Sequence, residues 1–280
     1  MFRLMKPTHA LFAIFTALLS SCGESGPQPP AKGTPAFYWA AAGETFKAGD
    51  YMKTNDHLEK LATGEYTARA VPWRLVLIDG MAQGYADLAD KFEMGGRANK
   101  TNPAPFRRQV SVYRNRASQL ALGFGEALQK FEKSNPSGDV ALEFAFPAGA
   151  AKQVAALNKV AEGLAIADSE LPATEKQALE RAVVLAVSRA VGAGEDSAKA
   201  REAFASGAAK ASVDVFLRGM AEAAVNRAEI FTPLKADQPD RFKFFCEQAA
   251  GLVKKLPDSK ETKELKTKIE EMVKKGAKKR

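Results

Sequence analysis

Several residue types that carry chemistry are scarce in this sequence of 280 residues. Histidine occurs only as His9 and His57, which excludes a metal site built from several histidines. Cysteine occurs only as Cys22 and Cys246, so the chain has no Cys-x-x-Cys motif. After the first 22 residues, no stretch reaches the ~18 consecutive apolar residues that a membrane-spanning helix needs. Tryptophan is equally rare, whereas alanine is abundant, and this composition favours helices.

Motifs of common catalytic sites are also missing. The sequence contains no HExxH, GxSxG, SxxK or P-loop pattern. Gly123-Phe124-Gly125 lies within a helical pattern and follows no strand, so it does not indicate a dinucleotide site. His57 stands beside Asp56 and Glu59, and we interpret it as a surface residue rather than a general base. We therefore expect a protein that is not an enzyme, with no catalytic residue, no metal site and no cofactor.

The first 22 residues have the organisation of an export signal. Arg3 and Lys6 provide a positively charged start. The apolar run at 11–19 is too short to span a bilayer but has the length of a signal-peptide core. It ends in Leu19-Ser20-Ser21-Cys22.

This ending resembles the lipobox of bacterial lipoproteins, in which a cysteine follows an aliphatic residue and two small residues. The resemblance implies that residues 1–21 are removed and that Cys22 carries the membrane anchor, a diacylglycerol with a further acyl chain such as palmitate. Several acyl chains hold a protein on a membrane stably, whereas one does so only marginally. Gly23 stands where an aspartate would imply retention in the inner membrane, so the resemblance implies the periplasmic face of the outer membrane. An ordinary secretory leader is the alternative.

The residues that follow Cys22 predict a tether. Residues 22–34 are rich in glycine, proline and serine, which is typical of an extended linker. With Cys22 lipidated, Cys246 has no cysteine to pair with. Its spacing from Phe242 and Ala249 indicates a buried, small apolar side chain.

From Pro35 onward, the spacing of apolar residues predicts an all-α fold, an array of antiparallel helical hairpins. We divide it into an N-terminal region at 35–134 and a C-terminal region at 135–280, which either continues the same domain or forms its own. The first hairpin is expected at 35–48 and 50–63.

Its turn, Gly49-Asp50-Tyr51, together with Tyr38 and Ala42, resembles a tetratricopeptide repeat. The resemblance implies a helical hairpin that takes part in protein binding. No second copy follows at the ~34-residue period of such repeats. An ordinary hairpin with a Gly-Asp turn is the alternative.

A second, longer hairpin is expected at about 67–133. Two runs show heptad spacing: Leu75, Ile78, Ala82, Tyr85, Ala89 and Phe92, then Val110, Tyr113, Ala117, Leu120, Phe124, Ala127 and Phe131. Gly95-Gly96 breaks the pattern between them. Two helices of about 25–28 residues, each ~40 Å long, should pack antiparallel like a coiled coil.

One segment interrupts the helical pattern. Apolar residues alternate with others over 139–146, which predicts a short extended segment. No partner strand is evident, so we interpret it as a buried connector, with pairing to another chain as the alternative. Further helices are expected at 149–166, 173–192, 195–231, 238–256 and 258–276.

The positive charge is unevenly distributed. Residues 94–125 contain no acidic residue and six basic ones: Arg97, Lys100, Arg107, Arg108, Arg114 and Arg116. The four arginines at 107–116 lie off the heptad seam, so we expect them to face outward and to bind an anionic partner. That partner would be an acidic protein surface, lipid headgroups or lipopolysaccharide phosphate. A solvated face neutralised by acidic residues of another helix is the alternative.

These features together indicate a role in binding at the cell envelope. We expect a lipid-anchored scaffold or interaction module, because arrays of helical hairpins present extended grooves to other proteins. The alternative is a carrier that encloses a lipid or an apolar small molecule between the alanine-rich helices at 149–231. Nucleic acid is not expected as a partner, since an exported protein does not meet it. The basic residues at 274–280 are interpreted as a frayed, solubilising tail.

Overall fold

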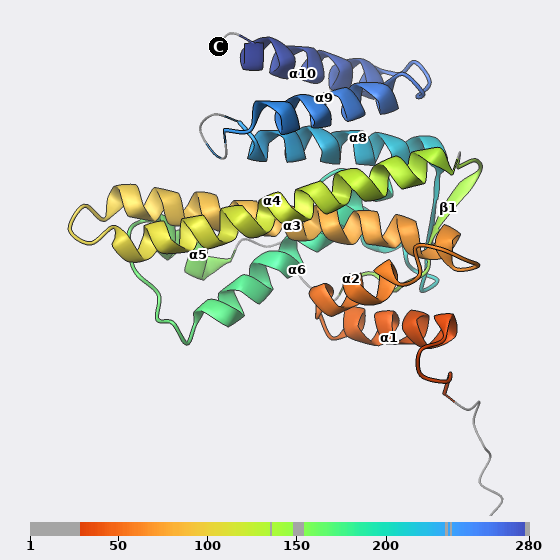
Figure 1. The fold of residues 1–280 in the computed structure, drawn as a ribbon, viewed down its shortest axis with the longest axis horizontal. Coiled ribbons are helices and arrows are strands. Elements are labelled where there is room, and N and C mark those ends of the chain that lie inside the picture. The colour runs from red at the N-terminus through yellow and green to blue at the C-terminus, as the bar shows by residue number, and fades with distance from the viewer. Residues whose placement is uncertain (1–28, 135, 148–153, 233–234, 236, 278–280) are drawn as a thin grey trace, which may run out of the picture.

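The computed structural model describes residues 29–134, 136–147, 154–232, 235 and 237–277. In this part of the chain the regular structure is helical apart from one two-stranded sheet, which confirms the all-α fold (Figure 1). The elements are α1 (Pro35–Lys47), α2 (Tyr51–Glu59), α3 (Thr67–Ala98), α4 (Ala104–Lys133), β1 (Asp139–Leu142), α5 (Ala155–Ala161), α6 (Leu171–Ala190), α7 (Ser197–Ala203), β2 (Ala209–Ser212), α8 (Val213–Ile230), α9 (Pro239–Val253) and α10 (Lys260–Ala277). The predicted leader, Cys22 and the first part of the predicted tether lie outside the described residues.

The long hairpin forms the centre of the molecule and confirms the heptad prediction. α3 has 32 residues and α4 has 30, so each is about 45–48 Å long at the rise of an α-helix and longer than predicted. The predicted break at Gly95-Gly96 is wrong, because α3 continues through both glycines to Ala98, and Gly95 instead allows the close approach of Phe106. All six heptad residues of α3 are buried, as are five of the seven in α4. α3 is buried far beyond that seam, since residues 70–82 are buried without exception. It is the central helix, packed against α4 and also against α2, α5, α6 and α8.

The first hairpin has the expected turn. Gly49 adopts a φ of +73°, which favours glycine. Asp50 then caps α2, its side chain accepting a hydrogen bond from the backbone N–H of Lys53. Thr34 caps α1 in the same way. The pair α1–α2 packs on the first half of α3 and forms the lower edge of the molecule in Figure 1.

The prediction of one helix over 195–231 is wrong. The chain forms α7, then β2, then α8. Gly207, with a φ of +88°, lies in the turn that separates α7 from β2. The side-chain oxygen of Ser212 accepts from the N–H of Val215 and starts α8. The segment is alanine-rich throughout, so composition alone did not distinguish its helices from its strand.

The extended segment near 139–146 is confirmed as β1, but the expectation that it lacks a partner strand is wrong. β1 pairs antiparallel with β2, in a register that places Val140 opposite Ala211 and Leu142 opposite Ala209. These four residues are buried. Because β2 reads Ala-Lys-Ala-Ser, it contains none of the β-branched or aromatic residues that identify strands in a sequence.

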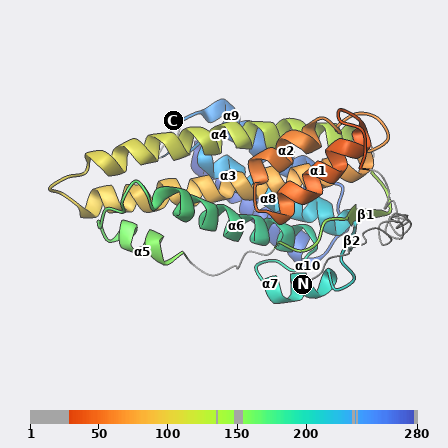
Figure 2. The ribbon, with the colours of Figure 1, turned by 90° about the horizontal axis from the view of Figure 1, so that it is seen from below.

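The remaining helices differ from expectation mainly at their ends. α6, α9 and α10 begin and end within a few residues of the predicted positions. α5 is much shorter than the 149–166 expected, and residues 149–153 lie outside the described part. α5 packs directly on the backbone of α3, because a Cβ atom at Gly95 would lie 2.1 Å from the carbonyl oxygen of Val160. Figure 2 shows α5 and α6 side by side along α3.

The helices form layers on both sides of the long hairpin. In Figure 1, α8, α9 and α10 lie above the hairpin and α1–α2 lie below it. The described chain therefore starts at one edge of the molecule, beside α1, while α10 forms the opposite edge. None of the helices in the described ranges has the length and apolar character needed to cross a membrane.

Candidate functional site

Three of the six basic residues at 94–125 are paired with carboxylates. Arg97 and Arg114 both contact Glu93 of α3, at nitrogen–oxygen distances of 2.9 and 2.8 Å. Arg116 contacts Glu175 of α6 at 2.6 Å. The Arg114 side chain is only 25% exposed, so the expectation that it faces outward is only partly met. Glu175 thus balances the charge of Arg116, whereas Arg97 and Arg114 share the single carboxylate of Glu93 and keep a net positive charge between them.

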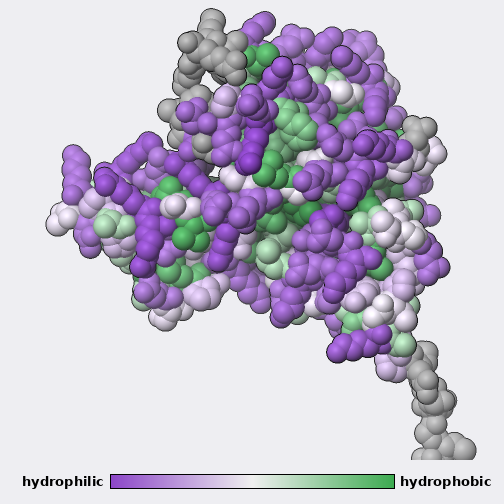
Figure 3. All heavy atoms as spheres, viewed as in Figure 1, coloured by the Kyte–Doolittle hydropathy of each residue, from purple (hydrophilic) through white to green (hydrophobic). Residues whose placement is uncertain are grey.

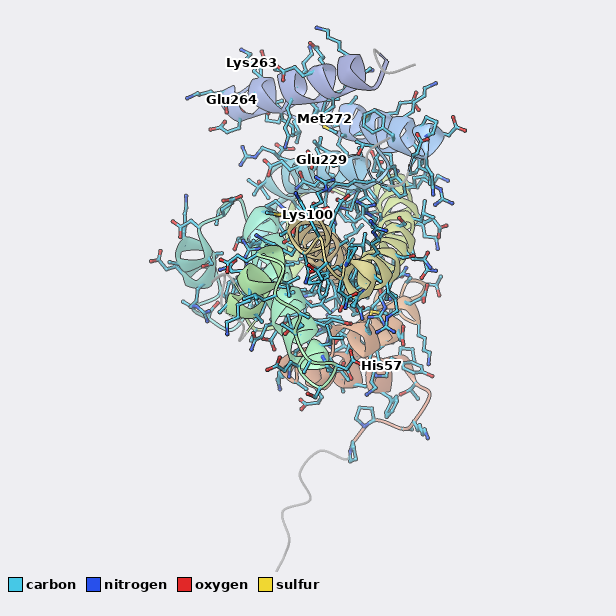
Figure 4. All side chains as sticks on the ribbon, turned by 90° about the vertical axis from the view of Figure 1, so that its left-hand side faces the viewer. His57, Lys100, Glu229, Lys263, Glu264 and Met272 are labelled. Carbon is cyan, nitrogen blue, oxygen red and sulfur yellow. The ribbon has the colours of Figure 1, made fainter. Side chains whose placement is uncertain are left out.

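The other three basic residues form the tip of the long hairpin. Lys100, Arg107 and Arg108 are exposed, and they make no ion pair within 4 Å among the described residues. Figure 4 places Lys100 at the end of the hairpin that faces the viewer, away from His57 at the α1–α2 edge. The six charges predicted as one patch are therefore divided between an exposed tip and the sides of α3 and α4.

A groove of 440 Å³ runs between α4 and three residues around the start of α9, namely Lys235, Gln238 and Arg241. Its first wall consists of Arg114, Asn115, Ser118, Gln119 and Leu122, all from α4. These positions form two adjacent rows with a spacing of four residues, so they share one face of the helix. The second wall consists of Lys235, Gln238 and Arg241. The lining contains three cations and no carboxylate.

Each cation of the groove is held by a different contact. Glu93 holds Arg114, and Asp90 holds Lys235 with 2.8 Å between Oδ2 and Nζ. The guanidinium of Arg241 lies 5.7 Å from the ring centre of Phe231, a cation–π contact. Within the described residues Arg241 has no carboxylate within 4 Å, so it brings a full positive charge to the groove.

The sequence analysis predicted only one of the residues that line this groove. Arg114 was among the predicted residues, whereas Lys235, Gln238 and Arg241 were not. The chain from Arg114 to Lys235 is over a hundred residues long, and no local pattern indicates that the two meet. The groove arises because α8 and α9 pack above α4.

A second cleft, of 330 Å³, opens between α3, α5 and α6. Four apolar residues and four charged ones line it together with Asn158: Met94, Val154, Leu157 and Ala178, and Asp87, Asp90, Lys91 and Arg181. Arg181 and Asp87 form an ion pair across it at 3.3 Å. This lining is mixed, unlike the continuous apolar cavity that a lipid carrier would need.

A cluster of charged side chains is buried where α3, α6 and α8 meet. Asp79 accepts a hydrogen bond of 2.6 Å from Arg189 at Oδ2. Arg227 donates to the backbone oxygen of Asp79 at 2.8 Å and, through its other terminal nitrogen, to Gln83. Asp79 and Arg227 are completely buried, and burial lowers the pKa of Arg227. Because solvent does not reach these two residues, we assign the cluster to the folding of the core rather than to ligand binding.

The three helices around this cluster approach one another at glycines. A Cβ atom at Gly80 of α3 would lie 2.7 Å from the Cα of Val183 on α6. One at Gly219 of α8 would lie 2.6 Å from the carbonyl oxygen of Arg189. At these contacts the alanine-rich helices meet backbone to backbone and leave no room for a ligand.

Cys246 and His57 are both placed away from the groove lining. Cys246 is buried, as its spacing predicted. His57 is half-buried, with its ring centre 6.1 Å from that of Tyr38, so it is less exposed than expected. Within the described residues, no group of three or more His, Cys, Asp or Glu side chains is placed to hold a metal ion.

The thiol of Cys246 should react slowly with alkylating reagents. Burial, aided by the Glu247 carboxylate, raises its pKa to about 11. Because only the thiolate reacts, we expect iodoacetamide to alkylate it at least about 100-fold more slowly in the folded chain than in the urea-unfolded chain near pH 8. Mass spectrometry of a Cys22→Ser chain measures both rates. Equal rates would show that Cys246 is accessible and ionised.

The chain was also compared with known proteins. No protein-family model, no curated protein and no solved structure matches it.

Proposed function

We propose that this protein is a lipid-anchored component of the cell envelope that binds other proteins and does not catalyse a reaction. The observation that carries the proposal is the order of its parts. The lipobox-like Leu19-Ser20-Ser21-Cys22 precedes a Gly/Pro-rich segment, and a folded helical body follows from Pro35. This order suits a body held close to a membrane without being inserted in it.

The anchor and tether define where the body can act. Acyl chains on Cys22 would hold the chain at the membrane surface, with Gly23 favouring the outer membrane. Residues 22–34, even fully extended, span at most about 45 Å. The body would therefore remain within about one molecular length of the membrane, which suits a scaffold that holds partners there.

The surface of the body supports binding of proteins over carriage of an apolar ligand. Seven of the eight residues that line the groove between α4 and the start of α9 are polar or charged, and the hairpin tip carries three exposed cations. The carrier alternative needs an apolar cavity between the alanine-rich helices. Two of these, α6 and α8, instead meet backbone to backbone at Gly219, and four of the nine residues that line the cleft beside α6 are charged.

Crosslinking in native membranes tests this proposal. We expect mass spectrometry to recover a specific envelope protein crosslinked to the wild-type chain. The control is a fusion of residues 1–34 to an unrelated soluble domain, which reports mere proximity at the membrane. If the full chain recovers nothing beyond this control, the interaction role is wrong, and a small-molecule ligand becomes the better hypothesis.

A further inference from the structure

We propose that the groove between α4 and the start of α9 binds a short acidic segment of a protein partner. This inference deepens the proposed function and rests on it. It assigns the partner's chemistry and the residues that recognise it, chiefly Arg114, Lys235 and Arg241.

The charge of the groove suits an acidic ligand. Its lining has cations on both walls and no carboxylate, whereas the chain as a whole has 33 acidic residues beside its 41 basic ones. Arg114 and Lys235 are held by carboxylates of α3, which lie outside the lining. These contacts keep both cations in position, while Arg241 remains uncompensated among the described residues. A carboxylate entering between the walls would meet positive charge from both sides.

The neutral residues of the groove indicate a peptide rather than an isolated anion. Asn115, Gln119 and Gln238 each present one hydrogen-bond acceptor and two donors, and Ser118 presents both kinds. A phosphate group offers mainly acceptors and would use only the donors. A peptide backbone alternates N–H and C=O groups and would use both. The volume of 440 Å³ lies within the range of pockets that hold small ligands, so it suits a segment of a few residues.

The position of the groove favours a protein partner over the lipids of the proposed anchoring membrane. The described chain begins beside α1, at the edge of the molecule opposite α9 and α10. The edge nearest the anchor, residues 35–66, carries five acidic and three basic residues, so anionic lipid would not attract it. Figure 3 shows that hydrophilic side chains predominate on the face that the hairpin and the α8–α10 layers present in this view. The groove therefore lies toward the edge of the molecule that is opposite the start of the described chain.

Peptide binding by the purified full chain tests this inference. The full chain is placed in nanodiscs, and the probe is a fluorescein-labelled peptide of alternating glutamate and glycine. We expect saturable binding at physiological salt and none of the matching lysine peptide. Arg241→Glu and Ser118→Glu should each weaken binding at least about tenfold, because each places a negative charge in the groove.

Lys243→Glu is the matched control. It makes the same change of charge on α9, but its side chain is 72% exposed and outside the groove lining. We expect its affinity to stay within about twofold of wild type, and circular dichroism should show the same helicity for all variants. Equal weakening by Lys243→Glu, or no binding of the acidic peptide by the wild-type chain, would overturn the inference. So would a loss of peptide binding when the nanodisc contains phosphatidylglycerol, since lipid headgroups would then occupy the groove.

A crosslink from inside the groove tests whether the partner binds at this groove, independently of whether the protein binds a partner at all. A photoreactive residue replaces Gln119, which lines the groove, or Gln129, an exposed residue on the same helix outside the lining. We expect a crosslink in cells only from position 119, to a partner segment rich in Asp and Glu. A partner that crosslinks from Gln129 alone, or through a segment without acidic residues, would leave the proposed function intact and refute the assignment of the groove.

Discussion

Replacing Asp79 with alanine should lower the free energy of unfolding by about 3–5 kcal/mol, the typical effect of removing one partner of a buried ion pair. Asp79 is completely buried and is the carboxylate that both Arg189 and Arg227 contact. Without it, two guanidinium groups remain in the core with no carboxylate at their centre. Such uncompensated charge destabilises a fold strongly because burial removes its hydration.

Asp87→Ala is the matched control for this substitution. Asp87 lies two turns further along α3 and pairs with Arg181, but its side chain is 33% exposed. Water can solvate Arg181 when Asp87 is removed, so we expect the free energy of unfolding to fall by about 1 kcal/mol or less. Urea unfolding followed by circular dichroism measures both variants. If the two losses are equal, the cluster around Asp79 does not behave as a buried ion pair.

The second large effect concerns the lipid anchor that we propose on Cys22. Cys22→Ala should abolish incorporation of labelled palmitate and move the protein from the membrane to the soluble fraction, or leave it as an uncleaved precursor. Each methylene group of a buried acyl chain stabilises membrane binding by about 0.8 kcal/mol, so the loss of all chains removes the anchor entirely. Metabolic labelling and fractionation give the two readouts.

Cys246→Ala is the control for this experiment. It removes the other cysteine of the chain, which is buried in α9. We expect this variant to keep its palmitate and its place in the membrane fraction. Label that persists in Cys22→Ala, or wild-type protein that takes up none, would refute the lipoprotein assignment and favour an ordinary secretory leader.

Local patterns were sufficient for much of the fold. The heptad spacing in 67–133 predicted the long hairpin because apolar residues must share one face for two helices to pack. The turn at Gly49-Asp50 was predictable for a similar reason, since glycine allows a positive φ and aspartate caps the helix that follows. Both rules depend on neighbours within a few residues, and both held in the structure.

The candidate groove was predicted only in part. Arg114 stood out within a run that has no acidic residue, and it does line the groove. Lys235 and Arg241 stood in a segment of mixed charge that nothing distinguished. The basic residues at 94–125 were expected to face outward, yet three of the six pair with Glu93 or Glu175. Pairing depends on which helices become neighbours, and the charge run contains no information on that.

The sequence by itself determined the helical class, the long hairpin and the short extended segment, because each depends on residues close together in the chain. Only the tertiary structure decided that β2 pairs with β1 and that Asp79 and Arg227 meet in the core. An alanine-rich strand and a buried charge both contradict local preference. They are stable here because residues distant in sequence supply the hydrogen bonds and the opposite charge that burial requires.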